Sequence, residues 1–96
     1  MTTYVLIYNY VDNYLEARTP HRPEHLGIAK GYVEQGQLLM AGAYSSAPHG
    51  AILVFNVDDK AIIEEFAKND PYTKNGVVTS WEIREWNVAV GADRLA

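Results

Sequence analysis

The chain has 96 residues, a net charge of -4 and no cysteine. This length supports one domain, expected to span residues 1–96, while the acidic charge balance and the lack of a Lys/Arg cluster exclude nucleic acid and anionic membranes as partners. Without cysteine there are no disulfides and no thiolate chemistry, and since no apolar run approaches the ~20 residues of a membrane helix, a cytoplasmic protein is expected.

The first half of the chain predicts two strands joined by an irregular segment and a helix. Residues 3–10 are β-branched and aromatic on both faces, a pattern typical of a central strand. Residues 11–21 are polar and contain a proline, which favours a loop or a short irregular turn. A helix is expected from Pro23, which suits a first helical turn, to about Gln35, and residues 38–44 predict the second strand. The residues of this helix expected to be buried are Leu26, Ala29 and Val33.

The second half predicts a third strand, a second helix and a last strand. Residues 51–57 are almost continuously apolar and follow a turn. Asp58 is expected to cap the second helix. Residues 77–90 predict the last strand, and its alternation changes phase between Ile83 and Trp86, which indicates a bulge or a passage from one packing surface to another. The residues of the second helix expected to face inward are Ile62, Ile63 and Phe66.

The order of these elements, β-α-β-β-α-β, predicts an α+β domain built as a ferredoxin-like sandwich. In that arrangement a four-stranded antiparallel sheet carries both helices on one face. The predicted strands have aliphatic and aromatic residues on both phases, so the second face of the sheet also needs a cover. A homodimer that stacks two such sheets face to face would provide that cover.

His25 and Asp70, each in a proline-containing turn, carry the strongest chemical signal. A carboxylate that hydrogen-bonds one imidazole nitrogen fixes the tautomer and makes the other nitrogen a better proton acceptor. His25 lies in the first turn of the predicted helix, where the helix dipole favours the neutral imidazole that a general base needs. In a functional pair, Pro71 would hold the direction of the Asp70 carboxylate. The alternatives are a surface histidine and a purely structural turn at Asp70. Because the two residues are 45 positions apart, only the fold can bring them together.

Two arginines and one tyrosine are the candidate substrate-binding residues. Arg18 and Arg22 are four positions apart and would share a helix face, where their guanidinium groups would attract an anionic or phenolate oxygen. The alternative is that they pair on the surface with Glu16 or Glu24. Tyr72, beside the turn at Asp70, is the aromatic residue best placed to touch a ligand.

The chain carries no signal for a metal or a cofactor. Its histidines, at positions 21, 25 and 49, lack the H-x-x-x-H spacing of a metal-binding helix. His21 and His49 are expected to be solvated. We therefore expect a site without metal or cofactor.

In their order along the chain these features resemble the YCII-like family, within the dimeric α+β barrel superfamily. The resemblance runs from Tyr4 to about Val88 and rests on the opening strand, on Arg18 and on four short segments. Those segments are residues 22–26 (RPEHL), 36–42 (GQLLMAG), 69–72 (NDPY) and 76–77 (GV).

The resemblance implies a His–Asp dyad in a cleft, with His25 and Asp70 at the dyad positions and Arg18 holding a substrate oxygen. A few members of the family are lyases, such as dehydrochlorinases of chlorinated hydroxyquinols. The resemblance also suggests a cis peptide bond between Asp70 and Pro71. Members often begin the third strand with a hydroxyl residue, and here the chain departs from them, because residues 50–51 are glycine and alanine.

The leading hypothesis is a small cofactor-independent enzyme of the lyase or isomerase type. In it neutral His25, oriented by Asp70, removes a proton from a small cyclic or phenolic substrate, and Arg18 stabilises the oxygen that becomes negative. The main alternative is a dimeric module that binds a small aromatic or anionic molecule without chemistry. A third interpretation is an accessory subunit of a larger assembly. A haem-degrading monooxygenase is disfavoured, because no combination of residues marks an axial histidine.

Overall fold

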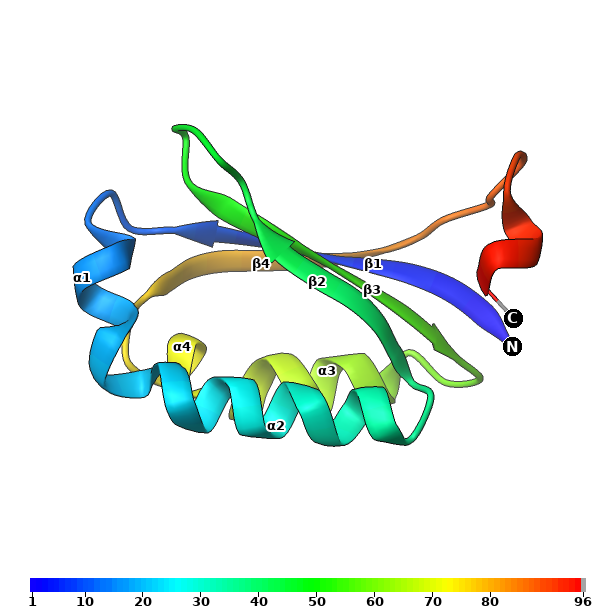
Figure 1. Ribbon diagram of the computed structural model, residues 1–96, viewed down its shortest axis with the longest axis horizontal. Helices are drawn as coiled ribbons and strands as arrows, with labels where there is room; N and C mark the ends of the chain where they lie inside the picture. Colours follow the sequence, from blue (N-terminus) through cyan, green and yellow to red (C-terminus); the bar gives the residue numbers. More distant parts are fainter. Residues whose placement is uncertain (96) are drawn as a thin grey trace.

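The structure, a computed structural model, describes residues 1–95 and folds them around one four-stranded antiparallel sheet (Figure 1). The strands are β1 (Thr2–Tyr10), β2 (Leu38–Ala43), β3 (Gly50–Val57) and β4 (Val78–Glu85), and they lie in the order β2-β3-β1-β4. The two longer helices are α2 (Arg22–Glu34) and α3 (Ala61–Asn69). The short elements are α1 (Tyr14–Arg18), α4 (Pro71–Lys74) and the 3-10 turns η1 (Thr19–His21) and η2 (Ala92–Leu95). Among residues 1–95, no helix combines the length and the apolar character needed to cross a bilayer.

Helices α2, α3 and α4 lie on one side of the sheet, and no α-helix of the described residues covers the other side, where the short turn η2 lies at one end (Figure 1). The central strand β1 pairs antiparallel with β3 on one side and with β4 on the other. The predicted α+β, ferredoxin-like arrangement is thereby confirmed.

The core lies between the sheet and the helix layer. Successive side chains of a strand point to opposite faces, so Leu6 and Tyr8 of β1 both face the helices, and both are fully buried. Asp70 is buried among these apolar groups, with 1% of its surface exposed. The other large and fully buried side chains are Tyr72, Phe55, Phe66, Leu38, Ile63, Val57 and Val77.

The second face of the sheet has no cover among the described residues, and it is apolar over β1, β2 and β3, whereas β4 adds Glu82 and Arg84 to it. Val5 and Ile7 of β1 lie opposite Val54 and Ile52 of β3 on this face. Large apolar patches left open in this way are typical of association surfaces. The exposed fractions of its largest apolar side chains are 62% for Met40, 40% for Ile52 and 47% for Trp86.

The polar segment after β1, predicted as a loop, forms the short helix α1 and the turn η1. The carbonyl of Asn13 accepts the backbone N–H groups of Glu16 and Ala17, at 3.1 and 3.0 Å. The segment is anchored by Tyr14, whose buried ring stacks on Tyr10 with a centroid distance of 5.1 Å. A single buried side chain in a helix of five residues gives too little periodicity to be predicted from sequence.

Helix α2 lies close to its predicted position, but it buries a different residue near its end. Ala29 is buried as expected, whereas Val33 is 49% exposed. The ring of Tyr32 packs edge-on against Phe55 and Phe66, with centroid distances of 6.4 and 5.1 Å. Because successive residues of a helix are about 100° apart, turning Tyr32 toward the core places Val33 near the solvent.

Two predictions for the second half are corrected. Strand β4 ends at Glu85, so the change of phase toward Trp86 marks the end of the strand, and the irregular register of its pairing with β1 lies elsewhere, between Asn9 and Tyr10. At the start of α3, the N–H of Ala61 donates to the side chain of Asp59 at 2.9 Å, not to the predicted Asp58.

Candidate functional site

Asp70 is a buried carboxylate at the junction of α3 and α4. Its Oδ1 accepts the backbone N–H of Tyr72 at 3.0 Å, so Asp70 is the N-cap of α4. Pro71 follows at the first helical position, where its missing N–H is no loss. The peptide bond between Asp70 and Pro71 is trans, so the cis bond that the resemblance suggested is wrong. The turn therefore has the structural role that the sequence left open, and it also fixes the direction of the carboxylate.

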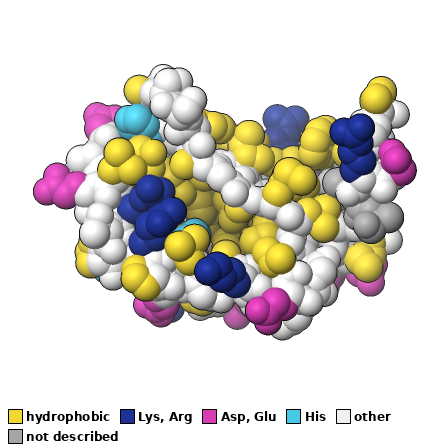
Figure 2. Space-filling view, in the orientation of Figure 1, with side chains coloured by type: hydrophobic (Ala, Val, Ile, Leu, Met, Phe, Trp, Pro, Cys, Tyr) yellow, Lys and Arg dark blue, Asp and Glu magenta, His cyan; other side chains and the backbone are white. Residues whose placement is uncertain are grey.

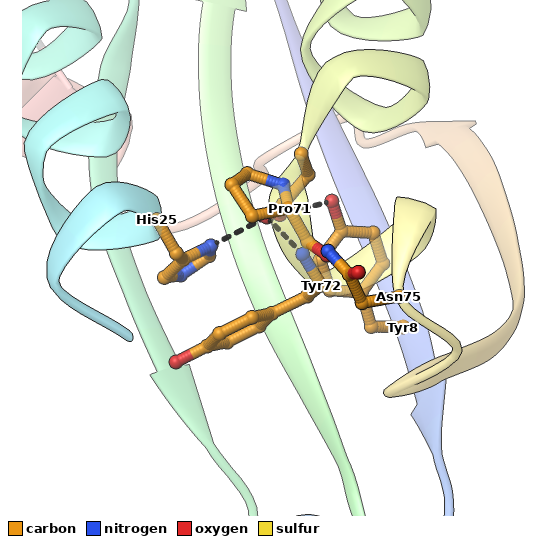
Figure 3. Close-up of polar contacts among 6 residues, drawn as sticks. Tyr8, His25, Pro71, Tyr72 and Asn75 are labelled. Atoms are coloured by element: carbon orange, nitrogen blue, oxygen red, sulfur yellow. Dashed lines mark hydrogen bonds and ion pairs between the residues drawn. The ribbon is translucent and has the colours of Figure 1, made fainter. Parts of the chain in front are cut away.

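The fold brings His25 to the same carboxylate (Figure 3). Nδ1 of His25 lies 2.8 Å from Oδ1 of Asp70. The ring of His25, from the first turn of α2, stacks on the ring of Tyr72, with centroids 3.8 Å and planes 7° apart. The hydrogen bond to Asp70 favours the tautomer in which Nδ1 carries the proton and Nε2 is a proton acceptor. The geometry of a His–Asp pair is present, and its use in catalysis stays a prediction.

Tyr8 is a third partner of Asp70, and no sequence pattern predicted this contact. Tyr8 belongs to β1, and its hydroxyl donates a hydrogen bond to Oδ2 of Asp70 at 2.7 Å (Figure 3). Burial, and then the negative charge of Asp70, raise the pKa of the Tyr8 phenol far above its usual value. The hydroxyl therefore stays protonated and is a donor at every pH at which the protein would be used.

A cavity of about 140 Å³ lies against the dyad, between α2, α4 and the end of the sheet. Figure 2 shows an apolar hollow on this side of the molecule, with positively charged side chains and a histidine at its edge. The cavity combines a polar wall of arginines and aromatic rings with a wall of small apolar residues. Its lining residues are Tyr10, Arg18, Arg22, His25, Leu26, Ala29, Ala41, Gly42, Ala43, Ala51, Leu53 and Tyr72.

Both predicted arginines line the cavity. The guanidinium carbon of Arg18 lies 5.1 Å from the centre of the Tyr14 ring. Burial raises the pKa of the Tyr72 phenol, and the positive charges of Arg18 and Arg22 oppose that rise. Within residues 1–95 neither arginine has a carboxylate within 4.0 Å, so the alternative of surface pairs with Glu16 or Glu24 is not observed. Two cationic groups thus remain available to an anionic ligand.

Tyr10 forms the aromatic end of the cavity and was not predicted as a site residue. Its ring meets Tyr72 edge-on, at a centroid distance of 6.2 Å, and stacks on Tyr14 on its other side. Burial, followed by the charges of Tyr72 and Asp70, raises the pKa of Tyr10. The signal that could have found it is its position in the strand, two residues after Tyr8 and therefore on the same face.

The other two histidines stand apart from the dyad. The ring of His49 packs on Tyr14 at a centroid distance of 4.8 Å, and its Nδ1 is buried without a hydrogen-bond partner among residues 1–95, so the expectation of a solvated side chain is wrong. His21 is half-buried at the end of η1. In the described part of the chain, no three His, Asp or Glu side chains are grouped so that they could hold a metal ion.

Comparisons with known proteins agree with this fold. The family model for the YCII-related domain matches residues 2–87. Among solved structures, the chain is similar to 5-chloro-2-hydroxyhydroquinone dehydrochlorinase (TftG) from Burkholderia phenoliruptrix AC1100, in complex with 2,5-dihydroxybenzoquinone. The TM-score is 0.76 at 17% sequence identity, over 88% of this chain and 93% of that one. No curated protein matches the sequence. On the family match, which covers most of its length, the chain belongs to the family of YCII-related domains.

Proposed function

We propose that this protein is a small cofactor-independent enzyme of the lyase or isomerase type, with His25 as its general base. The observation that carries the proposal is the 2.8 Å contact between His25 Nδ1 and Asp70 Oδ1, at the wall of a cavity that Arg18 also lines. A base, a residue that orients it and a cation for a developing negative charge are the parts that proton abstraction beside a carbonyl or phenol requires.

In the proposed reaction, Nε2 of neutral His25 takes a proton from the bound substrate. The electron pair of the broken bond moves toward a substrate oxygen, which becomes an enolate or phenolate. Arg18 and Arg22 stabilise that oxygen, and Asp70 stabilises the imidazolium through the hydrogen bond to Nδ1. In an isomerisation, the imidazolium returns its proton to another atom of the substrate. In an elimination, the electron pair expels a leaving group as an anion, and the proton is released afterwards.

The size and lining of the cavity support a single-ring substrate. A volume of about 140 Å³ is close to that of an engineered protein cavity of ~150 Å³ that holds benzene. Ala41, Ala43 and Ala51 leave room for a flat ring, while the two arginines favour a ring that carries an ionised oxygen. The dehydrochlorinase with the similar fold is in complex with 2,5-dihydroxybenzoquinone, a single ring with oxygen substituents, which supports the same substrate class here.

The first test is turnover of single-ring hydroxyquinols and hydroxyquinones, followed by their ultraviolet absorbance. The unaltered protein should convert at least one of them, and H25A should lose that activity while retaining its fold. Full turnover by H25A would contradict the proposal. Two-ring naphthoquinols of the same chemistry are the matched probe for the size of the site, and they should be bound more weakly and converted more slowly.

A binding module without chemistry is the second candidate function. It is favoured by the departure at the start of β3, where Gly50 and Ala51 supply no hydroxyl group for a developing oxyanion. It is also favoured by the fact that Asp70 has a structural task as the cap of α4. In that case the ligand would bind equally to the unaltered protein and to H25A, and no compound would be converted by either.

We also propose that the molecule works as a homodimer joined through the uncovered face of the sheet. Two shallow apolar hollows on that face share Ile52 and Val54, so they form one continuous surface. A second copy would offer the same surface, which makes a symmetric pairing self-complementary. Light scattering coupled to gel filtration should give twice the mass of the chain, and a monomer at micromolar concentration would contradict this part of the proposal.

A further inference from the structure

Tyr8 is a core residue whose hydroxyl does not serve packing. Its side chain is fully buried, a position in which a phenylalanine would fill nearly the same volume without a polar group. A buried hydroxyl needs a partner, and the partner here is Oδ2 of Asp70 at 2.7 Å. The two residues are 62 positions apart and come from different layers of the fold.

The two oxygens of Asp70 are divided between different donors. Oδ1 accepts from the backbone N–H of Tyr72 and from Nδ1 of His25, whereas Oδ2 accepts from Tyr8. A hydrogen bond to each oxygen fixes the rotation of the carboxylate, so Oδ1 is held toward His25. Each donor also withdraws negative charge from the carboxylate, which reduces its attraction for a positively charged imidazole.

Tyr8 acts on this pair from outside the cavity. Neither Tyr8 nor Asp70 is among the residues that line the cavity, whereas His25 is. A change at Tyr8 therefore reaches a bound ligand only indirectly, through Asp70 and its partners His25 and Tyr72 or through the neighbouring ring of Tyr10. This separation distinguishes Tyr8 from Tyr10 and Tyr72, which both face the ligand space.

We propose that Tyr8 is a positioning residue that orients Asp70 and sets how strongly His25 holds a proton. This inference rests on the proposed function of the His–Asp pair. It adds a buried hydroxyl that changes the proton affinity of His25 through Asp70, from the side of Asp70 that faces away from the cavity. A tyrosine is suited to this task because burial and the adjacent carboxylate raise its pKa, so it does not ionise in the working range.

Other groups also face His25, and Y8F leaves their chemistry unaltered. Tyr72 stacks on the ring from α4, Arg18 and Arg22 reach the cavity from α1 and α2, and Tyr10 reaches it from β1. Strands β2 and β3 contribute only residues without a titratable group: Ala41, Gly42, Ala43, Ala51 and Leu53. A change in the titration of His25 after a substitution at Tyr8 is therefore assigned to the link through Asp70.

The test replaces the hydroxyl and leaves the ring. Y8F removes the donor, and Y32F is the matched control, since Tyr32 belongs to the same core but packs on Phe55 and Phe66. Nitrogen-15 NMR follows the tautomer and the titration of His25 without any substrate. In Y8F the midpoint of that titration should rise by about one pH unit, because the carboxylate becomes a stronger partner for the imidazolium. In Y32F it should not move.

The same variants are then compared in turnover. In Y8F the acid limb of the pH–rate profile should move up with the NMR midpoint, and kcat should fall about tenfold at its optimum because Asp70 is less firmly oriented. KM should stay within twofold, since Tyr8 does not line the cavity. A structural role alone would lower the yield or the melting temperature without moving the profile.

A second variant keeps the proposal testable if Y8F does not fold. Replacement of Tyr8 by 3-fluorotyrosine retains the ring and the hydroxyl but makes the hydroxyl a stronger donor. The midpoint should then move in the opposite direction, to lower pH. An unchanged midpoint in 3-fluorotyrosine protein, or in folded Y8F, would overturn the role of Tyr8 even if H25A abolishes turnover. Conversely, shifted midpoints combined with full turnover by H25A would overturn the proposed function and leave the role of Tyr8 standing.

Discussion

On the face of the sheet that α2, α3 and α4 cover, β1 contributes Leu6 and Tyr8, and both are fully buried. On the opposite face the same strand contributes Val5 and Ile7, which lie beside exposed Ile52. The covered face also holds polar groups, and those of the His–Asp pair are joined by short hydrogen bonds. The uncovered face has a wide apolar surface.

This difference assigns different tasks to the two faces. A carboxylate can be buried only where donors reach it, and the covered face supplies them from β1, α2 and α4. The uncovered face offers apolar area that only another surface can remove from water. Chemistry is thus expected on the covered face and association on the other.

The largest expected effect is the loss of activity in H25A. Removal of a general base lowers kcat by about 10²–10⁴-fold. The variant should lose this activity while both faces of the sheet stay folded. Steady-state kinetics and a thermal melt on the same sample measure the two quantities. H21A is the control, because His21 does not line the cavity, and its kinetics should match those of the unaltered protein.

D70N should lower both the turnover rate and the free energy of unfolding, because Asp70 is the central acceptor on the covered face. The amide offers one acceptor oxygen in place of two, so Tyr8 or the pair formed by His25 and the Tyr72 N–H loses its partner. We expect a loss of about 2 kcal/mol in the free energy of unfolding, measured in urea. The rate should fall about 100-fold, because the amide can donate to Nδ1 and stabilise the wrong tautomer. Turnover at the original rate would show that Asp70 serves only as a helix cap.

I52E should show that association and activity depend on different faces of the sheet. A charge at the centre of the uncovered surface should convert the proposed dimer into a monomer, visible as a halved mass in light scattering. Activity per chain should stay within twofold, because Ile52 points away from the cavity. K68E places the same charge on the exposed side of α3 and is the control for a general effect of charge. A monomeric K68E would contradict the assignment of the interface to the sheet.

The smallest effect concerns stability in alkali. An unfolded tyrosine ionises near its usual pKa of 10.0, whereas burial and the Asp70 carboxylate hold the pKa of Tyr8 far above that value. The contribution of Tyr8 is therefore fully present below pH 10 and is lost as the pH rises toward the folded pKa. By linkage this loss is about 1.4 kcal/mol at pH 11. Urea unfolding at pH 9 and pH 11 should show a smaller drop in Y8F than in the unaltered protein.

Local sequence patterns were sufficient for the order of the four strands and the two longer helices, but not for the end of β4 or the residue that caps α3. They failed where one element depends on another. Val33 was expected in the core, but Tyr32 packs against the rings of Phe55 and Phe66 instead and leaves Val33 near the solvent. Helix α1 depends on the stacking of Tyr14 on Tyr10, a contact that no periodicity reveals in five residues.

The candidate site was predictable only in part for the same reason. His25 and Asp70 were selected by residue type, turn context and the resemblance to the YCII-like family, and the arginines by their spacing and, for Arg18, by the same resemblance. Tyr8 could not be selected, because an alternating strand pattern assigns it to the core without saying whether its hydroxyl meets a partner. That partner comes from a turn 62 residues later, so only the assembled fold identifies it.

The close packing of Gly50 against β1 limits how this site can evolve. A side chain at Gly50 would collide with the backbone oxygen of Tyr8 and crowd the ring of Tyr44, so no hydroxyl residue can be installed there without moving β1, the strand that carries Tyr8. The next position is different, because Ala51 lines the cavity. A single step to serine at Ala51 would add a hydroxyl facing the ligand. A single substitution at Ala51 would thus supply a hydroxyl group for a developing oxyanion, whereas the packing at Gly50 excludes one.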